Sequence, residues 1–155
     1  MVKIPLTQGK LAYIDDDDFE KISSFKWHAV KGKTSYYARS QFFVNGERNR
    51  LIMHKIIMPG SEIDHKNGDG LDNRKENLRV CSRSQNLFNR RKHSKSSSSY
   101  KGVSWNPLHK KWHSRIMKNK KQINLGYFDK EIDAAIAYDE SAKKLFGEFC
   151  HTNFK

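Results

Sequence analysis

The stretch DHKNGDGLDNRKENLR, residues 64–79, decides how this sequence is interpreted. Short runs that contain apolar residues lie at its two ends, over residues 62–65 and 77–81, and the residues between them are polar and glycine-containing. This pattern predicts two short strands joined by a long polar loop. Ser82 follows as a candidate N-cap for a helix over residues 83–91. We therefore expect strand, loop, strand and helix in this order.

The first of these strands ends in residues that can carry chemistry. Asp64 and His65 are adjacent there, and Asn86 stands 21 residues after His65 on the expected helix, which can pack across the hairpin. Carboxylate and amide oxygens suit a hard cation such as Mg²⁺ better than zinc. A histidine beside such a cation can take a proton from water, and the cation can polarise a phosphodiester. From these residues alone, a structural histidine is the simpler interpretation.

The wider sequence resembles the HNH endonuclease motif, in the form found in phage and intron-associated homing endonucleases. The resemblance covers about residues 36–91, and its segments are LIMH (51–54), the stretch 64–79 and SQN (84–86). It implies a ββα-metal fold with one catalytic divalent ion, Mg²⁺ in the first place and Mn²⁺ as the alternative.

By position, this resemblance assigns metal binding to Asp64 and Asn86 and the role of general base to His65. It places Asn77 in the catalytic group as the residue that ties the loop together by hydrogen bonds. His54 matches the first histidine of the motif, and phosphate contact, packing and catalysis all stay open for it. The cysteines that bind zinc in some HNH proteins are absent, so no structural zinc is expected.

The residues upstream are expected to form strands and a helix. Runs at 36–44 and 48–54 flank Asn45-Gly46, a dipeptide typical of a tight β-hairpin. The acidic run Asp15–Asp18 is expected to open a helix with a capping carboxylate, rather than to bind a metal. Trp27 is expected in the core.

Positive charge is concentrated in one block of the chain. The net charge is +13, and residues 77–128 hold 13 basic residues and no acidic one. A polyanion such as a nucleic acid is the natural partner, because phosphates neutralised by Lys or Arg release condensed counterions. Two alternatives are weaker: a merely solubilising surface, since aromatic residues are interleaved with the charges, and a membrane surface, since no amphipathic basic helix carries them.

The block is interrupted by the polar run SKSSSS, residues 94–99, which is expected to be a flexible linker. A second region follows, in which Asp129 is expected to cap a helix that ends before Gly147. Alternation and β-rich composition predict three strands before this helix, over residues 103–106, 112–118 and 122–128.

Residues 100–154 resemble the Apetala/ethylene-response-factor type of DNA-binding domain. The resemblance is carried by segments such as YKGV (100–103), LGYFD (125–129) and AAIAYD (134–139). It implies a three-stranded sheet that lies in the major groove of DNA with the helix packed behind it. The plant domains are rich in arginine at several groove-facing positions where this sequence is not, so their base preference is not transferred.

Strand alternation gives the same division of the sheet independently. Trp112, Ser114 and Ile116 share one face, and His113, Arg115 and Met117 lie on the other. Together with basic residues of the turns and of the junction, the residues expected to contact DNA are Lys101, Ser104, Asn106, Lys110, Lys111, Arg115, Met117, Gln122, Asn124, Arg90 and Arg91.

Length and composition exclude several other classes of protein. The chain of 155 residues allows one domain or two small ones. No apolar run approaches the ~18 residues of a membrane span, and the first residues lack the apolar region of a signal peptide. The two cysteines, Cys81 and Cys150, form no CxxC motif, so an intracellular, cytoplasmic setting is expected.

The sequence therefore predicts an α+β protein of two modules. A ββα-metal HNH module over residues 1–92 is joined by a linker at 93–99 to a module over 100–155, in which a three-stranded antiparallel sheet packs on one helix. The expected activity is metal-dependent hydrolysis of double-stranded DNA by a monomer, with site selection by the second module. A DNA-binding regulator with a silent HNH fold and an RNA-binding protein are the alternatives.

Overall fold

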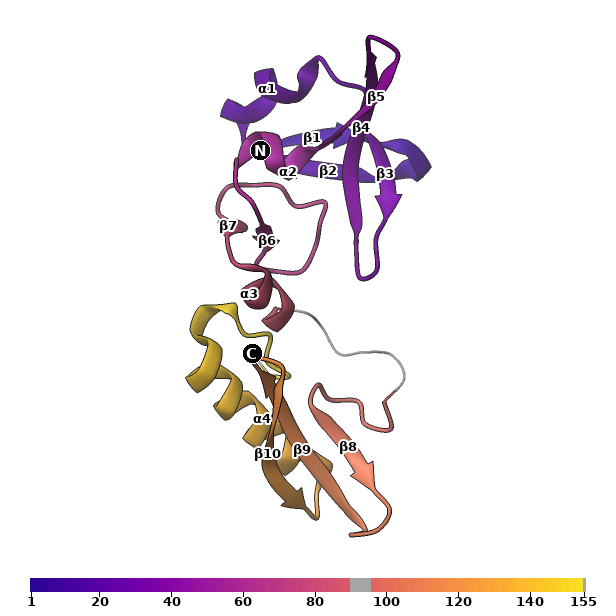
Figure 1. Cartoon of the computed structure of the whole chain (residues 1–155). Helices are drawn as coiled ribbons and strands as arrows, with labels where there is room; N and C mark the ends of the chain where they lie inside the picture. The colour runs from indigo at the N-terminus through magenta and orange to yellow at the C-terminus, as the bar shows by residue number, and fades with distance from the viewer. Residues whose placement is uncertain (90–95, 155) are drawn as a thin grey trace. The chain divides into compact units, whose positions relative to one another are not determined.

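The computed structural model describes residues 1–89 and 96–154. The expected contacts of Arg90 and Arg91 therefore lie outside the described residues. The chain forms two compact units, Met1–Asn86 and Leu87–Lys155, which are described separately below. Both combine small antiparallel sheets with helices, which confirms the α+β class (Figure 1). In the described part of the chain, no helix is long and apolar enough to cross a membrane.

Unit 1 contains three small antiparallel sheets, with strand orders β1-β2, β3-β4-β5 and β6-β7. Two 3-10 turns, at Thr7–Gly9 and Asp16–Asp18, lie between its first elements. Its strands and helices are β1 (Val2–Pro5), β2 (Leu11–Ile14), α1 (Phe19–Ser23), β3 (His28–Lys31), β4 (Tyr36–Val44), β5 (Glu47–Ile52), α2 (Met53–Ile57), β6 (Ile63–His65), β7 (Leu78–Val80) and α3 (Arg83–Phe88), of which α3 runs past the unit boundary.

The hairpin of β4 and β5 confirms the expected turn. Val44 pairs with Glu47, so the loop consists of Asn45 and Gly46 alone. Both residues have positive φ, 50° and 80°. A two-residue turn of this kind follows the right-handed twist of the strands, and asparagine and glycine adopt it at least cost.

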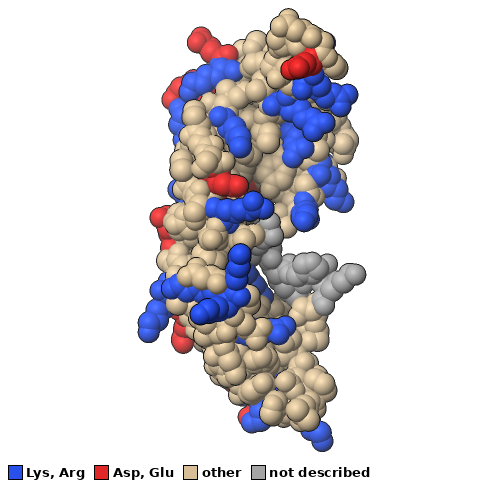
Figure 2. Space-filling model, in the orientation of Figure 1, with Lys and Arg blue, Asp and Glu red and all other residues tan. Residues whose placement is uncertain are grey.

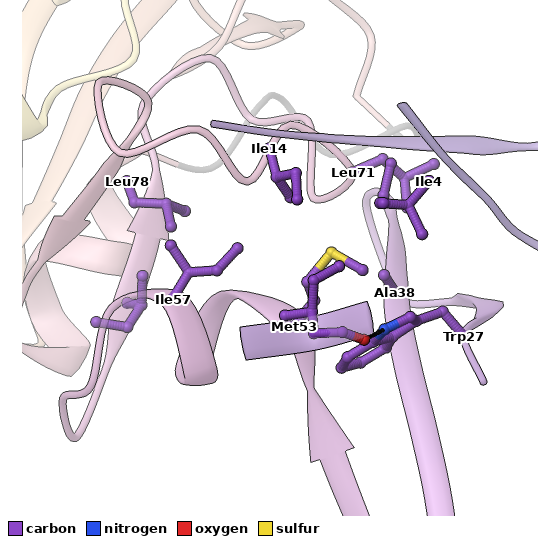
Figure 3. Close-up of a cluster of buried hydrophobic side chains, with 11 residues drawn as sticks. Ile4, Ile14, Trp27, Ala38, Met53, Ile57, Leu71 and Leu78 are labelled. Carbon is purple, nitrogen blue, oxygen red and sulfur yellow. Dashed lines mark hydrogen bonds between the residues drawn. The ribbon is translucent and has the colours of Figure 1, made fainter. Parts of the chain in front are cut away.

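A single apolar cluster holds unit 1 together (Figure 3). Ile14 of β2, Ile22 of α1 and Met53 of α2 are fully buried at its centre. Trp27 is buried there as expected, and its indole N–H donates to the carbonyl of Ile22 at 2.9 Å, which satisfies the one polar group of the ring. Met53 precedes His54 on α2, so this core also fixes the helix that carries the candidate histidine.

The acidic run Asp15–Asp18 opens the helical segment as expected, but the expected capping is wrong. Neither Asp15 nor Asp18 makes a side-chain cap hydrogen bond. Asp15 instead accepts the backbone N–H of Lys75 at 2.8 Å. The fully buried Asp18 lies 2.6 Å from the ammonium of Lys21 and 3.1 Å from that of Lys75. The run therefore anchors the long loop of the candidate site, a contact that no local sequence pattern encodes.

In unit 2, the three-stranded sheet and the helix are present as expected. The strand order is β10-β9-β8, and all neighbours are antiparallel. One face of the sheet packs on the helix, because Val103 and Ile116 are buried against its alanines and Tyr138. The elements are β8 (Val103–Asn106), β9 (Lys111–Lys118), β10 (Lys121–Phe128), α4 (Glu131–Phe146) and a 3-10 turn at Gly147–Phe149.

The structure differs from the sequence-based expectation at the start of α4. Lys130, not Asp129, is the N-cap residue, and no side chain caps the helix there. The Asp129 carboxylate instead lies 3.2 Å from the ammonium of Lys111. Glu131, in the first turn, accepts the hydroxyl of Ser98 at 2.6 Å and the N–H of Ser99 at 2.8 Å.

These contacts also contradict a flexible linker over the described serines. Ser98 is 2% exposed. Ser96 donates its hydroxyl to the carbonyl of Val103 at 3.0 Å, and Ser97 accepts the N–H of Trp105 at 2.9 Å. Hydroxyl groups that bond to backbone and to a carboxylate order this run against unit 2. The other residues of the expected linker, 93–95, lie outside the described residues.

Candidate active site

Two paired strands and a helix place the candidate residues of unit 1. In β6 and β7, Asp64 pairs with Arg79 and His65 with Leu78, and α3 follows directly. Successive side chains of a strand point to opposite faces, so Asp64 and His65 project in different directions. The capping of α3 is as expected: Ser82 accepts the N–H of Gln85 at 3.2 Å, and the Gln85 amide oxygen accepts the N–H of Ser82 at 2.7 Å.

The loop over residues 66–77 is held by side-chain amides. Asn77 is 6% exposed, its amide oxygen accepts the N–H of Asn67 at 3.0 Å, and its amide nitrogen donates to the carbonyl of Asp72 at 2.7 Å. Asn73 is 1% exposed, and its backbone N–H donates to the carbonyl of Tyr13 on β2 at 2.8 Å. These bonds span the loop from within, as expected for an ordering role of Asn77.

We predict that Asn77→Ala lowers the melting temperature of the protein and leaves its metal affinity unchanged. The substitution leaves the buried carbonyl of Asp72 without its partner, at a cost of about 1–3 kcal/mol, and also removes the acceptor of the Asn67 N–H. The measurements are calorimetric melting and titration with Mg²⁺. Asn49→Ala is the matched control, since Asn49 is exposed and makes one hydrogen bond, to Glu47. Unchanged stability together with lost metal binding would make Asn77 a ligand instead.

His65 is a buried imidazole that is neutral at physiological pH. It is 6% exposed, and burial lowers its pKa below the usual value, against the opposing effects of the Asn73 hydrogen bond and the charge of Asp64. Its Nε2 lies 3.2 Å from the amide oxygen of Asn73, whose amide nitrogen donates to the carbonyl of Leu71. An amide oxygen only accepts hydrogen bonds, so Nε2 carries the proton and Nδ1 the lone pair.

Two aromatic rings pack around His65. The ring of His54 lies edge-on to it with 4.9 Å between centroids, and Tyr37 of β4 lies 6.0 Å from His65 and 6.1 Å from His54. A Cβ atom at Gly32 or at Gly70 would stand within 2.7 Å of the Tyr37 ring, so both glycines are needed for its position. The sequence interpretation missed Tyr37, because its partners are distant along the chain.

His54 lies among these rings as a buried, uncharged residue. It is 8% exposed, and burial, followed by the nearby His65, Lys55 and Arg39, lowers its pKa to about 3. Its Nδ1 is buried and has no hydrogen-bond partner among the described residues. Of the three roles left open for His54, this position most directly supports packing.

We predict that burial of His54 makes the protein less stable in mild acid. The unfolded chain binds a proton on this histidine below pH ~6.5, whereas the folded protein does not until about pH 3. The free energy of unfolding should therefore fall as the pH drops below ~6.5, by up to about 1.4 kcal/mol per pH unit for this residue. Urea titrations from pH 7.5 to 5 should show a shallower dependence for His54→Phe. The same change at exposed His109 should leave the slope unaltered; equal slopes for wild type and His54→Phe would refute the assignment.

The candidate metal ligands lie among other oxygen-bearing side chains. Asp64 is 5% exposed, and its Oδ2 accepts two bonds from Arg79, from Nε at 2.9 Å and Nη2 at 2.7 Å. The amide nitrogen of Asn86 donates to the Glu62 carboxylate at 3.3 Å. Cys81 lies close to both acids, since burial and then the charges of Asp64 and Glu62 raise the pKa of its thiol. Glu62 and Arg79 were not expected in the site.

The side chains of Asp64, Glu62 and Asn86 offer the kind of ligand atoms that a hard divalent cation prefers. Two carboxylates and an amide supply oxygen ligands, as Mg²⁺ and Mn²⁺ require. Among residues 1–89 and 96–154, no group of three or more His, Cys, Asp or Glu side chains is arranged to hold a metal ion. An ion at Asp64 would share its carboxylate with the guanidinium of Arg79. Asp64, Asn86 and Glu62 are the residues that would hold it.

The outer face of the sheet in unit 2, opposite α4, collects most of the residues expected to contact DNA. Ser114 and Ile116 are at most 2% exposed on the helix side, whereas Met117 is 53% exposed on the other side. Strand register places Arg115 opposite Asn124. By the same alternation, this outer face holds Ser104, Asn106, Lys111, Arg115, Met117, Gln122 and Asn124, together with His113, which was expected on this face, and Tyr127, which was not.

The outer face is organised by contacts between its own side chains. His113 is hydrogen-bonded to the Asn124 amide oxygen at 3.0 Å and stacks on Tyr127 with 4.7 Å between ring centroids. Arg115 lies 3.5 Å from the Gln122 amide oxygen. These contacts hold polar side chains out from the strands, in a position from which they can meet a ligand.

Three of the expected DNA contacts have other surroundings. The ammonium of Lys101 donates to the carbonyl of Phe88 at 2.7 Å, and burial lowers its pKa to about 8. Lys110 is exposed, with φ of 50°, in the turn between β8 and β9. The amide oxygen of Asn106 accepts two backbone N–H groups of the same turn, at 3.0 Å each. Lys101 is thus turned inward, and Asn106 shapes the turn.

Comparison with known proteins relates one segment of the chain to a known family. Residues 57–88 match the model of the HNH endonuclease family, and this segment contains Asp64, His65, Asn77 and Asn86. This segment is therefore similar to the HNH endonuclease family, and the similarity suggests a nuclease. Over 149 residues it is 28% identical to an uncharacterized HNH endonuclease of Acanthamoeba polyphaga mimivirus, across 94% of this chain and 76% of that protein. No solved structure matches the chain.

Proposed function

We propose that the protein is a metal-dependent endonuclease that hydrolyses phosphodiester bonds in double-stranded DNA. The observation that carries this proposal is the state of His65 within the HNH segment. A neutral imidazole, held by Asn73 and adjacent in sequence to Asp64, is suited to act as a general base.

In this proposal His65 takes a proton from the water that attacks phosphorus, a new P–O bond forms, and the bond to the leaving oxygen of the DNA strand breaks. Asp64 and Asn86 would hold a divalent cation, which would polarise the phosphodiester and stabilise the charge on the leaving oxygen. The amide of Asn73 fixes the imidazole, and Asn77 keeps the loop that contains Asn73 in shape.

We assign the choice of cleavage site to the outer face of the sheet in unit 2. This face presents Arg115, Gln122 and Asn124, and side chains of these types read base edges in the major groove. The resemblance of this region to Apetala/ethylene-response-factor type domains supports the same role. A homing or other mobile-element endonuclease is the biological setting that the HNH resemblance suggests.

The deciding experiment is a cleavage assay on random-sequence duplex, with the ends mapped on each strand. We expect cleavage with Mg²⁺ and none with EDTA, and the mapped ends distinguish nicks from double-strand breaks. Site-specific binding without cleavage in any divalent metal would instead establish a DNA-binding regulator with a silent HNH fold. Preferential binding of RNA in competition with duplex DNA would overturn both.

We predict that Arg115→Ala weakens binding to the preferred site by about 1–3 kcal/mol if Arg115 reads a guanine. It should affect a scrambled duplex much less, because phosphate contacts carry no sequence information. Fluorescence anisotropy on both duplexes measures the difference. Lys144→Ala removes one exposed positive charge from α4 and is the control. Equal losses on both duplexes would show that Arg115 contacts phosphate only.

A further inference from the structure

The hairpin of β4 and β5 has two different faces. Its register pairs Ser40 with Leu51 on one face, and Ala38, Ser40 and Leu51 there pack into or beside the core of unit 1. The opposite face is named here the arginine face. Alternation along the paired strands assigns to it Tyr37, Arg39, Gln41, Phe43, Arg48 and Arg50.

The arginine face carries positive charge that nothing in the described part of unit 1 neutralises. The acidic residue of these two strands, Glu47, pairs with Val44 on the other face. None of Arg39, Arg48 and Arg50 has an ion pair with another described residue, and the Nε of Arg39 is buried without a hydrogen-bond partner. In Figure 2, blue side chains gather over the part of unit 1 where Figure 1 places β4 and β5.

The outer part of the hairpin protrudes from unit 1. Every residue from Gln41 to Arg50 is exposed, and Phe43 near the tip is 66% exposed. The guanidinium of Arg48 lies 6.0 Å from the centre of the Phe43 ring, which keeps both side chains on the arginine face. A protruding two-stranded ribbon has the width that the major groove of duplex DNA admits.

The arginine face begins close to His65, the candidate base. Tyr37 contacts His54 and His65, and Arg39, two residues further along β4, lies close enough to His54 to lower its pKa. From Tyr37 to Phe43 the strand extends about 20 Å at ~3.3 Å per residue, comparable with about six base-pair steps of 3.4 Å. The charges therefore form a row from the candidate site to the hairpin tip.

We propose that the arginine face is a DNA-binding surface of the catalytic unit itself. Arg39, Arg48 and Arg50 bind phosphates of the duplex beside the cleaved bond, with Arg39 nearest to it. This inference rests on the proposed function, because it takes duplex DNA as the substrate at His65.

The test compares two substitutions that add the same charge to opposite faces of the hairpin. Gln41→Glu adds a negative charge to the arginine face, and Asn49→Asp adds one to the other face; both residues are exposed. Binding of the full-length protein to one labelled duplex of fixed sequence is measured in EDTA at several KCl concentrations. We expect Gln41→Glu to weaken binding about tenfold and Asn49→Asp by less than twofold.

A second variant tests the arginines themselves. Arg48→Gln combined with Arg50→Gln should reduce the slope of log K against log salt by about 0.9 for each phosphate that the variant no longer neutralises. The control is Lys3→Gln combined with Lys26→Gln, which removes two exposed charges outside β3–β5. Melting curves of all variants establish that they are folded.

The outcomes separate this inference from the proposed function. The arginine face does not bind DNA if Gln41→Glu and Asn49→Asp weaken duplex binding equally. The same conclusion follows if the double variant of Arg48 and Arg50 has the salt slope of wild type, whatever the protein cleaves. If RNA competes better than duplex DNA, and Gln41→Glu weakens the binding of RNA rather than of duplex DNA, the inference is also wrong. If wild type cleaves no DNA but Gln41→Glu still loses duplex binding selectively, the proposed function fails and the binding surface stands.

Discussion

His65→Ala is expected to lower the rate of DNA cleavage by about 10²–10⁴, the usual contribution of a general base. The imidazole is buried and neutral, so its removal takes away the proton acceptor without removing a charge that attracts DNA. Affinity for the duplex should stay within about twofold of wild type. The measurement is single-turnover cleavage at saturating protein, with anisotropy for binding.

The pH dependence provides an independent readout for the same residue. A base works in its neutral form, and burial lowers the pKa of His65, so the wild-type rate should fall at a more acidic pH than the ordinary histidine pKa of about 6.5 would give. His113→Ala is the control, because it removes a histidine from β9 in unit 2 and should leave the rate of the chemical step unchanged. If the His65→Ala variant cleaved DNA at the wild-type rate, His65 would not be the general base.

Asp64→Asn is expected to abolish Mg²⁺-dependent cleavage. The carboxylate of Asp64 is the charged member of the expected ligand pair, since Asn86 contributes only a neutral amide. The isosteric amide keeps an oxygen within reach of Arg79, so it disturbs the fold less than alanine would. Cleavage is followed across a Mg²⁺ titration, with calorimetry for metal binding and melting curves for folding.

Asp69→Asn is the matched control for Asp64→Asn. Asp69 lies in the loop that follows β6, but it is exposed and accepts the backbone N–H of Leu71 at 3.0 Å. It should retain both cleavage and metal affinity. If Asp64→Asn retained the Mg²⁺ half-saturation of wild type, the ion would have to be held by other residues, and Glu62 would be the first to examine.

Elements that depend on local signals could be predicted well from the sequence. The Asn45-Gly46 turn, the capping of α3 by Ser82 and strand β8 lie where the pattern placed them, because each is specified within a few residues. The two faces of the sheet in unit 2 follow from alternation, and the burial of Ser114 and Ile116 confirms that division.

What the sequence could not supply are the partners of polar side chains across long separations. Asp15 bonds to Lys75 across 60 residues, and an acidic run before a helix is locally indistinguishable from a cap. Tyr37 reaches His65 because β4 and β6 meet in three dimensions. Arg79 reaches Asp64 through the pairing of β6 with β7. Each contact depends on tertiary packing, which no spacing rule in the sequence expresses.

The placement of Phe88 determines where the chain can be cut and rejoined in a chimera. Its ring stacks on Phe146 at 3.7 Å, and its carbonyl accepts the ammonium of Lys101, so the last turn of α3 is packed as part of unit 2. A segment that transfers unit 2 to another protein should therefore begin at Leu87 and carry the serine run with it. A junction placed after the serines would leave Phe146 without its stacking partner and would remove the 2.7 Å hydrogen bond from the Lys101 ammonium to the Phe88 carbonyl.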